Sequence, residues 1–468
     1  MAEESELKEL EEELSFNAES GWLEDIDEET LESLAEEYKT FLAEAKTERE
    51  AASEIVERAE DEGFVPLDEV DEYEQGTKVY AVNRGKQVLL AELGDGLLDG
   101  IRMTVAHLDS PRLDLKQQPL YEDADLAMLD THYYGGIKKY QWANVPLALH
   151  GVVVDGDGDS HEIVIGEGGD DPVFLVPDLL PHLSKDQLQK ELKEAIEGEE
   201  LNLVVGNMPV DDDEVENAVK LQILQYLDEE HGLTEEDLAS AEFEAVPATE
   251  PRDLGLDRSM IAAYGQDDKG LSFTTMEAFF DADPSVTAIA GFFDKEEIGS
   301  EGNTSAQSEF LERFIAELLE LEGVDRPHSG VYQAFDRTEA LSTDVAAAVN
   351  PTYQDVHDQK NAINLGQGVS LVKFTGRGGK YAANDAHAEF VGKVRKLLNA
   401  EDIPWYPVEM GKVDQGGGGT VAKYLSRRGA DVVDLGFSLL SMHSPYEVSS
   451  KADVYHTYRA CREFFESE

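Results

Sequence analysis

The chain has 468 residues, of which 41% are hydrophobic, and carries 101 Asp and Glu against 38 Lys and Arg, a formal net charge of −63. Such an excess of acid disfavours binding to nucleic acid or to an anionic membrane, because either partner would be repelled. A single cysteine, Cys461, excludes an intrachain disulfide framework and a zinc site made of several thiolates.

The N-terminal region predicts an amphipathic helical pattern over residues 29–62. Its apolar residues recur at spacings of three and four, beginning with Leu31, Leu34, Tyr38, Phe41, Leu42 and Ala45. The first residues contain neither a basic n-region nor an apolar h-region, and no later stretch approaches the roughly 18 apolar residues of a membrane span. We therefore expect a cytoplasmic protein without a membrane partner.

Two β-like runs follow. Residues 78–93 alternate around the turn Arg84-Gly85-Lys86, and residues 101–106 form an apolar run that stops at His107. The middle of the chain, residues 117–252, then changes character, with the aromatic stretch THYYGGIKKYQW followed by β runs and polar helices. We interpret this middle section as an inserted, β-rich domain.

After the insertion, strand and helix patterns alternate. The predicted helices are residues 269–280, 305–321 and 386–398, and the predicted strands are residues 286–293, 370–374 and 431–435. Such alternation is typical of a largely parallel sheet covered by helices. The predicted fold is thus α/β, a three-layer α/β/α sandwich formed by residues 1–116 and 253–468, with the insertion of residues 117–252 between them.

Acidic residues run along the whole chain rather than in one tail. We expect them to form a solvated acidic surface, which concentrated salt would screen, because the Debye length falls to about 3 Å at 1 M. The composition therefore indicates a protein from a halophile.

Polar clusters lie at or near the ends of predicted strands, where open α/β sheets place their sites. They are AHLDSP (106–111), YGQDDKG (264–270), DKEEIGS (294–300) and SMHSPYE (441–447), with LSTDV (341–345) in a polar loop region. Their histidines and carboxylates suit Zn²⁺, and would also accept Co²⁺ or Mn²⁺. Each cluster alone is a common polar loop, but Glu296 and Glu297 follow an apolar strand, where two carboxylates are costly without a cation.

GGGGT (416–420) lacks the lysine of a phosphate-binding P-loop, so we expect a tight turn or close backbone approach there.

The segments AHLDSPRLDLK, QDDKG, DKEEIGS, STD and MHSPYE occur in the order found in the aspartyl aminopeptidase and vacuolar aminopeptidase I family of zinc metallopeptidases. The chain resembles most the bacterial branch of this family, called aminopeptidase 1, and the likeness extends over nearly the whole sequence. It implies a dinuclear zinc aminopeptidase that removes N-terminal residues from peptides. It also implies a homo-oligomer built from dimers, a tetrahedral dodecamer, in which the insertion serves as a dimerisation or lid domain.

The resemblance also implies a role for individual residues. His107 and Asp344 would bind one zinc ion, Glu297 and His443 the other, and Asp267 would bridge them. Asp109 would orient the His107 imidazole, and Glu296 would be the general base that moves a proton from water to the leaving amine. Substrate binding would involve Lys373 and, in a neighbouring subunit, His182. Enzymes with this metal layout commonly have a cis peptide after the bridging aspartate, here Asp267-Asp268.

The chain departs from the wider family where many members have a histidine three residues after the last aspartate ligand. Ala347 stands there, and Thr352 follows Pro351 where a Pro-Asn is usual, so substrate handling could differ from that of the aspartyl-specific branch. Two alternatives stay open from the sequence. One is another amide hydrolase with the same metals, a deacylase or carboxypeptidase, and the other is a non-catalytic, self-assembling or cation-binding protein.

Overall fold

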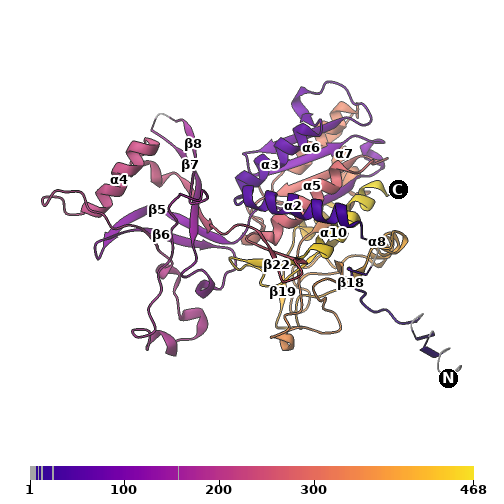
Figure 1. The fold of residues 1–468 in the computed structure, drawn as a ribbon. Coiled ribbons are helices and arrows are strands. Elements are labelled where there is room, and N and C mark those ends of the chain that lie inside the picture. The colour runs from indigo at the N-terminus through magenta and orange to yellow at the C-terminus, as the bar shows by residue number, and fades with distance from the viewer. Residues whose placement is uncertain (1–6, 9, 12–13, 24–25, 157, 468) are drawn as a thin grey trace.

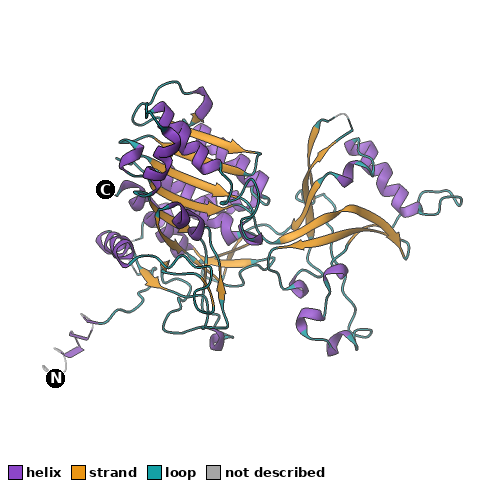
Figure 2. Cartoon of the chain, turned by 180° about the vertical axis from the view of Figure 1, so that it is seen from behind, coloured by secondary structure: helices purple, strands orange, loops and turns teal. Residues whose placement is uncertain are grey.

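The computed structural model describes residues 7–8, 10–11, 14–23, 26–156 and 158–467. Two large sheets organise these residues into two parts that lie side by side (Figure 1). The larger part is built on a nine-stranded sheet and holds both ends of the described chain. The smaller part is built on a six-stranded sheet and extends away from it, as the view from behind also shows (Figure 2).

The nine-stranded sheet is parallel at its centre and mixed at its edges. Its strands are, in spatial order, β1 (Val65–Pro66), β2 (Lys78–Asn83), β3 (Gln87–Glu92), β13 (Ala288–Phe293), β4 (Arg102–His107), β14 (Glu339–Thr343), β20 (Asp431–Gly436), β16 (Val369–Val372) and β18 (Trp405–Pro407). The neighbours β13, β4, β14 and β20 pair in parallel, whereas β2, β3 and β16 introduce antiparallel pairs. Four carboxyl ends therefore meet at one edge of the sheet.

Helices cover both faces of this sheet. One apolar core lies between the sheet and α2 (Glu28–Glu44), α3 (Glu48–Asp61), α5 (Gln266–Phe280), α8 (Ala388–Ala400) and α10 (Lys451–Glu466). A second core lies on the opposite face beneath α6 (Phe310–Leu321), α7 (Pro327–Phe335) and α9 (Ala422–Arg428). The central strands are buried on both faces, which explains their continuous apolar runs. The three-layer α/β/α prediction is confirmed.

The smaller part has an antiparallel sheet with its own core. The strands are, in order, β8 (Ser160–Ile165), β7 (Leu147–Val154), β10 (Glu242–Pro247), β5 (Arg112–Asp123), β6 (Leu126–Tyr134) and β9 (Leu203–Gly206). The helix α4 (Ala218–His231) accompanies them, and the fully buried Trp142 belongs to their core. Smaller sheets join β11 (Arg252–Leu254) to β12 (Met260–Ala263) and β22 (Glu447–Ser450), β15 (Ala346–Ala347) to β21 (Ser438–Leu439), and β17 (Gly376–Arg377) to β19 (Gly417–Gly418).

The helical pattern predicted over residues 29–62 is confirmed, but two helices occupy it, with a break at residues 45–47 that was not foreseen. Thr47 caps the second one: its Oγ1 accepts the N–H of Glu50 at 3.2 Å, while the Glu50 carboxylate accepts the N–H of Thr47 at 2.9 Å. This capping box satisfies backbone donors that would otherwise lack partners, so a new helix starts there. The apolar spacing continues across the break, which is why the sequence pattern concealed it.

Other predicted elements agree within a few residues, with one exception. Residues 341–345 were expected in a polar loop, but Leu341 to Thr343 belong to the central strand β14. Its serine and threonine are buried, and Thr343 Oγ1 donates to the Val105 carbonyl at 2.9 Å. A buried hydroxyl with a hydrogen-bond partner, such as that of Thr343, is compatible with a central strand. Helices α7 and α10 were not anticipated.

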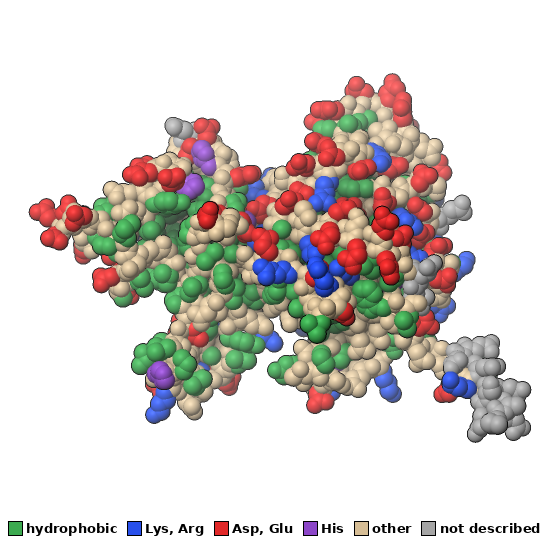
Figure 3. Space-filling model, in the orientation of Figure 1, with side chains coloured by type: hydrophobic (Ala, Val, Ile, Leu, Met, Phe, Trp, Pro, Cys, Tyr) green, Lys and Arg blue, Asp and Glu red, His purple; other side chains and the backbone are tan. Residues whose placement is uncertain are grey.

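Acidic side chains are spread over both parts on the face shown in Figure 3, whereas hydrophobic side chains gather on the smaller part. Exposed apolar residues of that part include Val154, Val164, Val173, Leu175, Leu179, Leu180, Leu183, Leu188 and Leu192. Among the described residues, no helix combines the length and the apolar character that crossing a membrane requires.

The capping box gives a stability prediction. Replacing Thr47 by alanine should lower the free energy of unfolding by about 1 kcal/mol, because an N-cap acceptor is lost. Urea titrations at fixed zinc concentration would measure it. The matched control is Thr40→Ala, an exposed position inside α2, where the change should stay within about 0.5 kcal/mol. Equal effects of the two substitutions would contradict the capping role.

The acidic surface gives a second prediction. Thermal melts from dilute buffer to molar KCl should show a rising melting temperature, since screening weakens the repulsion among surface carboxylates. NaCl at the same ionic strength is the control for a specific ion effect, and it should give a similar shift. A melting temperature that does not respond to salt would end the halophile interpretation.

Candidate metal centre

The predicted site residues converge at the carboxyl edge of the nine-stranded sheet. His107 is the last residue of β4, Asp344 follows β14, and Glu296 and Glu297 lie just after β13. Asp267 lies at the start of α5, after β12, and His443 precedes β22. Parallel neighbours bring the first three positions together, and the small sheet of β12 and β22 brings Asp267 and His443 to the same place.

Two groups of side chains in this cluster could each hold a metal ion. The first comprises His107, Asp267, Asp268 and Asp344, and the second comprises Asp267, Glu297 and His443, with candidate ligand atoms within 4.8 Å of one another in each group. Asp267 belongs to both groups. Its two carboxylate oxygens face different histidines: Oδ1 lies 3.4 Å from His107 Nε2 and Oδ2 lies 3.0 Å from His443 Nε2.

The His107 imidazole is held from its far side. Its Nδ1 lies 2.9 Å from the Asp109 carbonyl oxygen and 3.3 Å from Asp109 Oδ1, which leaves Nε2 directed at Asp267. The Asp109 carboxylate also accepts the backbone N–H groups of Glu296 at 2.9 Å and Glu297 at 3.1 Å. A single buried carboxylate therefore links the His107 ring to the backbone of both glutamates.

The His443 imidazole is held in a similar way. Its Nδ1 lies 2.7 Å from the carbonyl oxygen of Gly136, and its Nε2 lies 3.3 Å from Glu297 Oε1. The Glu447 carboxylate accepts the N–H of His443 at 2.6 Å and that of Asp267 at 3.1 Å. Both histidines thus present Nε2 to the same cluster of carboxylates.

The backbone around Asp267 has the form that the resemblance implied, since the Asp267-Asp268 peptide is cis. The two residues depart from helical geometry inside α5. The Asp267 carbonyl accepts the Ser110 hydroxyl at 2.6 Å, and Asp268 Oδ2 accepts the His107 N–H at 3.1 Å. Asp267 and Asp268 are consequently tied to the end of β4.

The cluster contains more acidic than basic side chains. Burial raises the pKa of Glu297 and Asp344 well above the ordinary carboxyl value, and nearby aspartates add to the effect. Burial lowers the pKa of His443, but the hydrogen bond to Asp267 and the charges of Glu297 and Asp267 raise it to about 11. Buried carboxylates at this density need a positive charge close by.

The donor set fits a divalent metal. Imidazole nitrogens and carboxylate oxygens are ordinary ligands of zinc, and two buried oxygens, Glu297 Oε1 and Asp268 Oδ1, have no hydrogen-bond partner. A bound cation would stabilise these carboxylates in their charged form and leave the imidazoles neutral. The residues therefore fit the metal that the resemblance implies.

Glu296 stands apart from both groups. Burial raises the pKa of its carboxyl to about 7; the charge of His107 lowers this pKa, and the charges of Asp109 and Asp267 raise it. A buried carboxyl group with a raised pKa beside such a cluster is a candidate for proton transfer. The role of Glu296 as general base stays a prediction.

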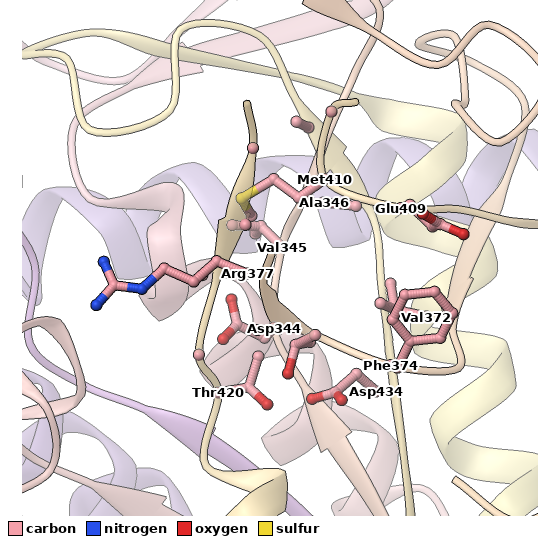
Figure 4. Close-up of a pocket in the computed structure, with 18 of the residues that line it drawn as sticks. Asp344, Val345, Ala346, Val372, Phe374, Arg377, Glu409, Met410, Thr420 and Asp434 are labelled. Atoms are coloured by element: carbon pink, nitrogen blue, oxygen red, sulfur yellow. The ribbon is translucent and has the colours of Figure 1, made fainter. Parts of the chain in front are cut away.

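A cavity of about 620 Å³ opens over the cluster. His107, Asp267, Glu296, Glu297, Asp344 and His443 line it, together with the glycine run of residues 416–419 and apolar side chains such as Val372 and Phe374. In Figure 4, Asp344, Thr420 and Asp434 lie close together, whereas Arg377 points away from them. The cavity is large enough for the end of a peptide, and the glycine run approaches it closely.

The two predicted substrate residues lie elsewhere in this chain. Lys373 follows β16 but is not among the lining residues of the cavity, and its Nζ forms an ion pair with Asp385 at 3.0 Å. His182 is an exposed residue of the smaller part. Their proposed roles stay predictions.

The sequence reasoning missed three contributors to the site: Asp268, Glu447 and the segment Tyr134–Gly136. Asp268 and Glu447 were visible inside the quoted motifs, but only the fold shows which backbone groups they hold. Tyr134 lies 25 residues after its partner Asp109, and Gly136 lies 307 residues before its partner His443. Both belong to the part of the chain interpreted as an insertion. Their signal, a tyrosine before two glycines, is too common to indicate a site.

Known proteins resemble this chain over nearly its whole length. The curated sequences include the probable M18 family aminopeptidase 1 of Thermotoga neapolitana, which is 50% identical over 441 residues that cover 94% of this chain and 96% of the relative. The corresponding protein of Clostridium acetobutylicum is 46% identical over 431 residues, covering 91% and 92%.

Solved structures share the fold. The crystal structure of an M18 family aminopeptidase from Thermotoga maritima matches with a TM-score of 0.95 and 47% identity, covering 97% of this chain and 100% of the other. The aminopeptidase I of Clostridium acetobutylicum matches with a TM-score of 0.91 and 42% identity over the same shares.

The family model described as aminopeptidase I zinc metalloprotease (M18) matches residues 41–465. This range includes every residue of the metal cluster and both parts of the fold. The resemblance seen in the sequence is thereby confirmed, and the chain belongs to the M18 family of zinc aminopeptidases.

Proposed function

We propose that this M18 aminopeptidase uses two zinc ions per chain and Glu296 as its general base. The observation that carries the proposal is the position of Asp267, which belongs to both groups of candidate ligands and directs one oxygen toward each histidine. A carboxylate placed in this way is suited to bridge two metal ions.

The remaining ligands follow from the two groups. His107 and Asp344 would complete one site, and Glu297 and His443 the other. Asp268 also belongs to the first group, but its Oδ2 accepts the backbone N–H of His107, so we assign it to holding the end of β4. Co²⁺ or Mn²⁺ could replace zinc in this ligand set.

The chain's residues divide the chemical work. Bound zinc supplies a Lewis acid that polarises the scissile carbonyl and lowers the pKa of water. Glu296 takes a proton from the attacking water and gives it to the amine that leaves. Asp109 fixes the His107 ring and the backbone of Glu296, so that the base and the ligand keep their relative positions. The substrate's free α-amine is required, which makes the enzyme an exopeptidase.

We further propose that the two parts of the fold have different functions. We assign residues 1–116 and 253–468 to the catalytic domain and residues 117–252 to a dimerisation or lid domain. The exposed apolar side chains of the smaller part favour association with further copies. On this assignment the enzyme is a homo-oligomer, and a tetrahedral dodecamer would bring His182 to a neighbouring subunit's site.

Metal analysis and substrate choice test the proposal. Chelator-washed, zinc-reloaded protein should retain about two zinc ions per chain, as expected for a two-metal hydrolase, and should cleave a peptide with a free N-terminus but not its acetylated form. Cleavage of the acetylated peptide would favour a deacylase. Failure to hold zinc would favour a non-catalytic protein.

The adjacent glutamates give a sharper prediction, and each variant is the control for the other. Glu297→Gln should lose one zinc ion, because it removes a ligand charge. Glu296→Gln should keep both ions and the peptide KM, while kcat falls by roughly 10² to 10⁴, the usual contribution of a general base. Metal content and kcat of both variants decide the roles. If Glu296→Gln alone loses zinc, then Glu296 is the ligand and Glu297 the general base. If neither variant changes kcat, the mechanism is wrong.

A further inference from the structure

The smaller part of the fold reaches into the metal centre through one short segment. Strand β6 runs from the smaller part toward the larger one and ends at Tyr134, and Gly135 and Gly136 follow directly. We propose that Tyr134–Gly136 is a positioning segment that sets the orientation of both histidines of the metal centre. This inference rests on the ligand set proposed above.

Tyr134 acts on His107 through Asp109. The Tyr134 hydroxyl donates to Asp109 Oδ2 at 2.8 Å, and Asp109 is fully buried. The same carboxylate accepts the N–H groups of Glu296 and Glu297 and lies 3.3 Å from His107 Nδ1. The Tyr134 hydroxyl, which comes from the smaller part, therefore holds the Asp109 carboxylate in the position from which it contacts the His107 ring and the N–H groups of Glu296 and Glu297.

Gly136 acts on His443 directly. Its carbonyl oxygen lies 2.7 Å from His443 Nδ1, so the ring donates there and keeps its Nε2 lone pair for a metal. Nε2 faces Asp267 Oδ2 and Glu297 Oε1 at 3.0 and 3.3 Å. The segment thus holds Nδ1 of His443 directly, through the Gly136 carbonyl, and acts on Nδ1 of His107 through the Asp109 carboxylate.

The segment also touches the ligand carboxylate itself. Gly135 has φ of +71°, and a Cβ there would lie 3.4 Å from the Cβ and the Oε2 of Glu297 and 3.3 Å from Pro111 Cγ. A side chain at this position would be strained by the positive φ, and its Cβ would be tight against Pro111 Cγ and in van der Waals contact with Glu297. Glycine permits the close approach.

Tyr134 is in turn anchored to both parts of the fold. The Arg112 guanidinium lies 3.9 Å from the centre of its ring, and Arg112 and Tyr134 are paired across β5 and β6. Arg112 is buried and forms ion pairs with Glu48 of α3 at 3.2 Å and Glu244 of β10 at 3.1 Å. The position of the hydroxyl therefore depends on how the smaller part is seated on the larger one.

The test compares two tyrosines that are neighbours on β6. Tyr134→Phe removes the hydroxyl and keeps the ring over Arg112, whereas Tyr133→Phe removes the hydroxyl of a tyrosine that is 41% exposed on the other face of the strand. We expect Tyr134→Phe to weaken zinc binding or kcat by about 10- to 100-fold, as for other partners of metal-bound histidines. KM and the melting temperature should stay close to those of Tyr133→Phe.

Zinc affinity is measured without catalysis, by competition between the metal-free protein and a chromophoric chelator. The positioning role is overturned if Tyr134→Phe matches Tyr133→Phe in both zinc affinity and kcat. Glu297→Gln in the same titration reports on the ligand set separately. If it loses zinc while Tyr134→Phe behaves like its control, the ligand set stands and the positioning role fails.

A second pair of variants tests the glycine. Gly135→Ala should weaken zinc binding, because the strain at φ of +71° and the tight contact with Pro111 shift the segment whose Gly136 carbonyl holds His443. Gly323→Ala is the control, since Gly323 has φ of +81° and a Cβ there would meet nothing within 4 Å, so it carries the backbone strain alone. Equal zinc affinity of the two variants, at equal loss of melting temperature, would mean that the segment has a purely structural role.

Discussion

Mutual repulsion among buried carboxylates is the constraint on which the centre of this molecule depends. Asp267, Asp268, Glu296, Glu297 and Asp344 gather where four parallel strands end, and burial raises the pKa of several of them. Such a cluster is stable in its charged form only with cations between the side chains. Asp267 belongs to both groups of side chains that could hold a metal ion, and Glu297 Oε1 and Asp268 Oδ1 have no hydrogen-bond partner.

The carboxylates around the candidate ligands form their hydrogen bonds mostly with backbone N–H groups. Asp109 accepts two consecutive N–H groups of the glutamate turn, Glu447 accepts those of Asp267 and His443, and Asp268 accepts that of His107. Three outer carboxylates thus tie four separate chain segments into one frame. Backbone amides move less than side chains, so a frame of this kind keeps ligand positions while the chemistry proceeds.

The smaller part has an exposed apolar face and also contributes residues next to the metal centre. Its exposed apolar face is suited to contact with other copies of the chain, and its strand β6 delivers Tyr134 and Gly136 to the back of the metal centre. The buried charges of Arg112, Glu48 and Glu244 lie at the junction of the two parts. Association of the smaller part and geometry of the metal centre are therefore physically connected through a few residues.

The sequence by itself determined the α/β class, the central strands β4, β13 and β20, and the identity of the clustered residues. Local periodicity and the position of His107, Glu296 and Glu297 after apolar runs can be recognised from consecutive residues. It also led to the M18 family through motifs in a fixed order. Tertiary structure alone decided the break at Thr47, the strand that carries Leu341 to Thr343, and the partners of each histidine. Those depend on which backbone groups meet across long separations, such as Gly136 with His443, and no local pattern encodes a contact between residues that far apart.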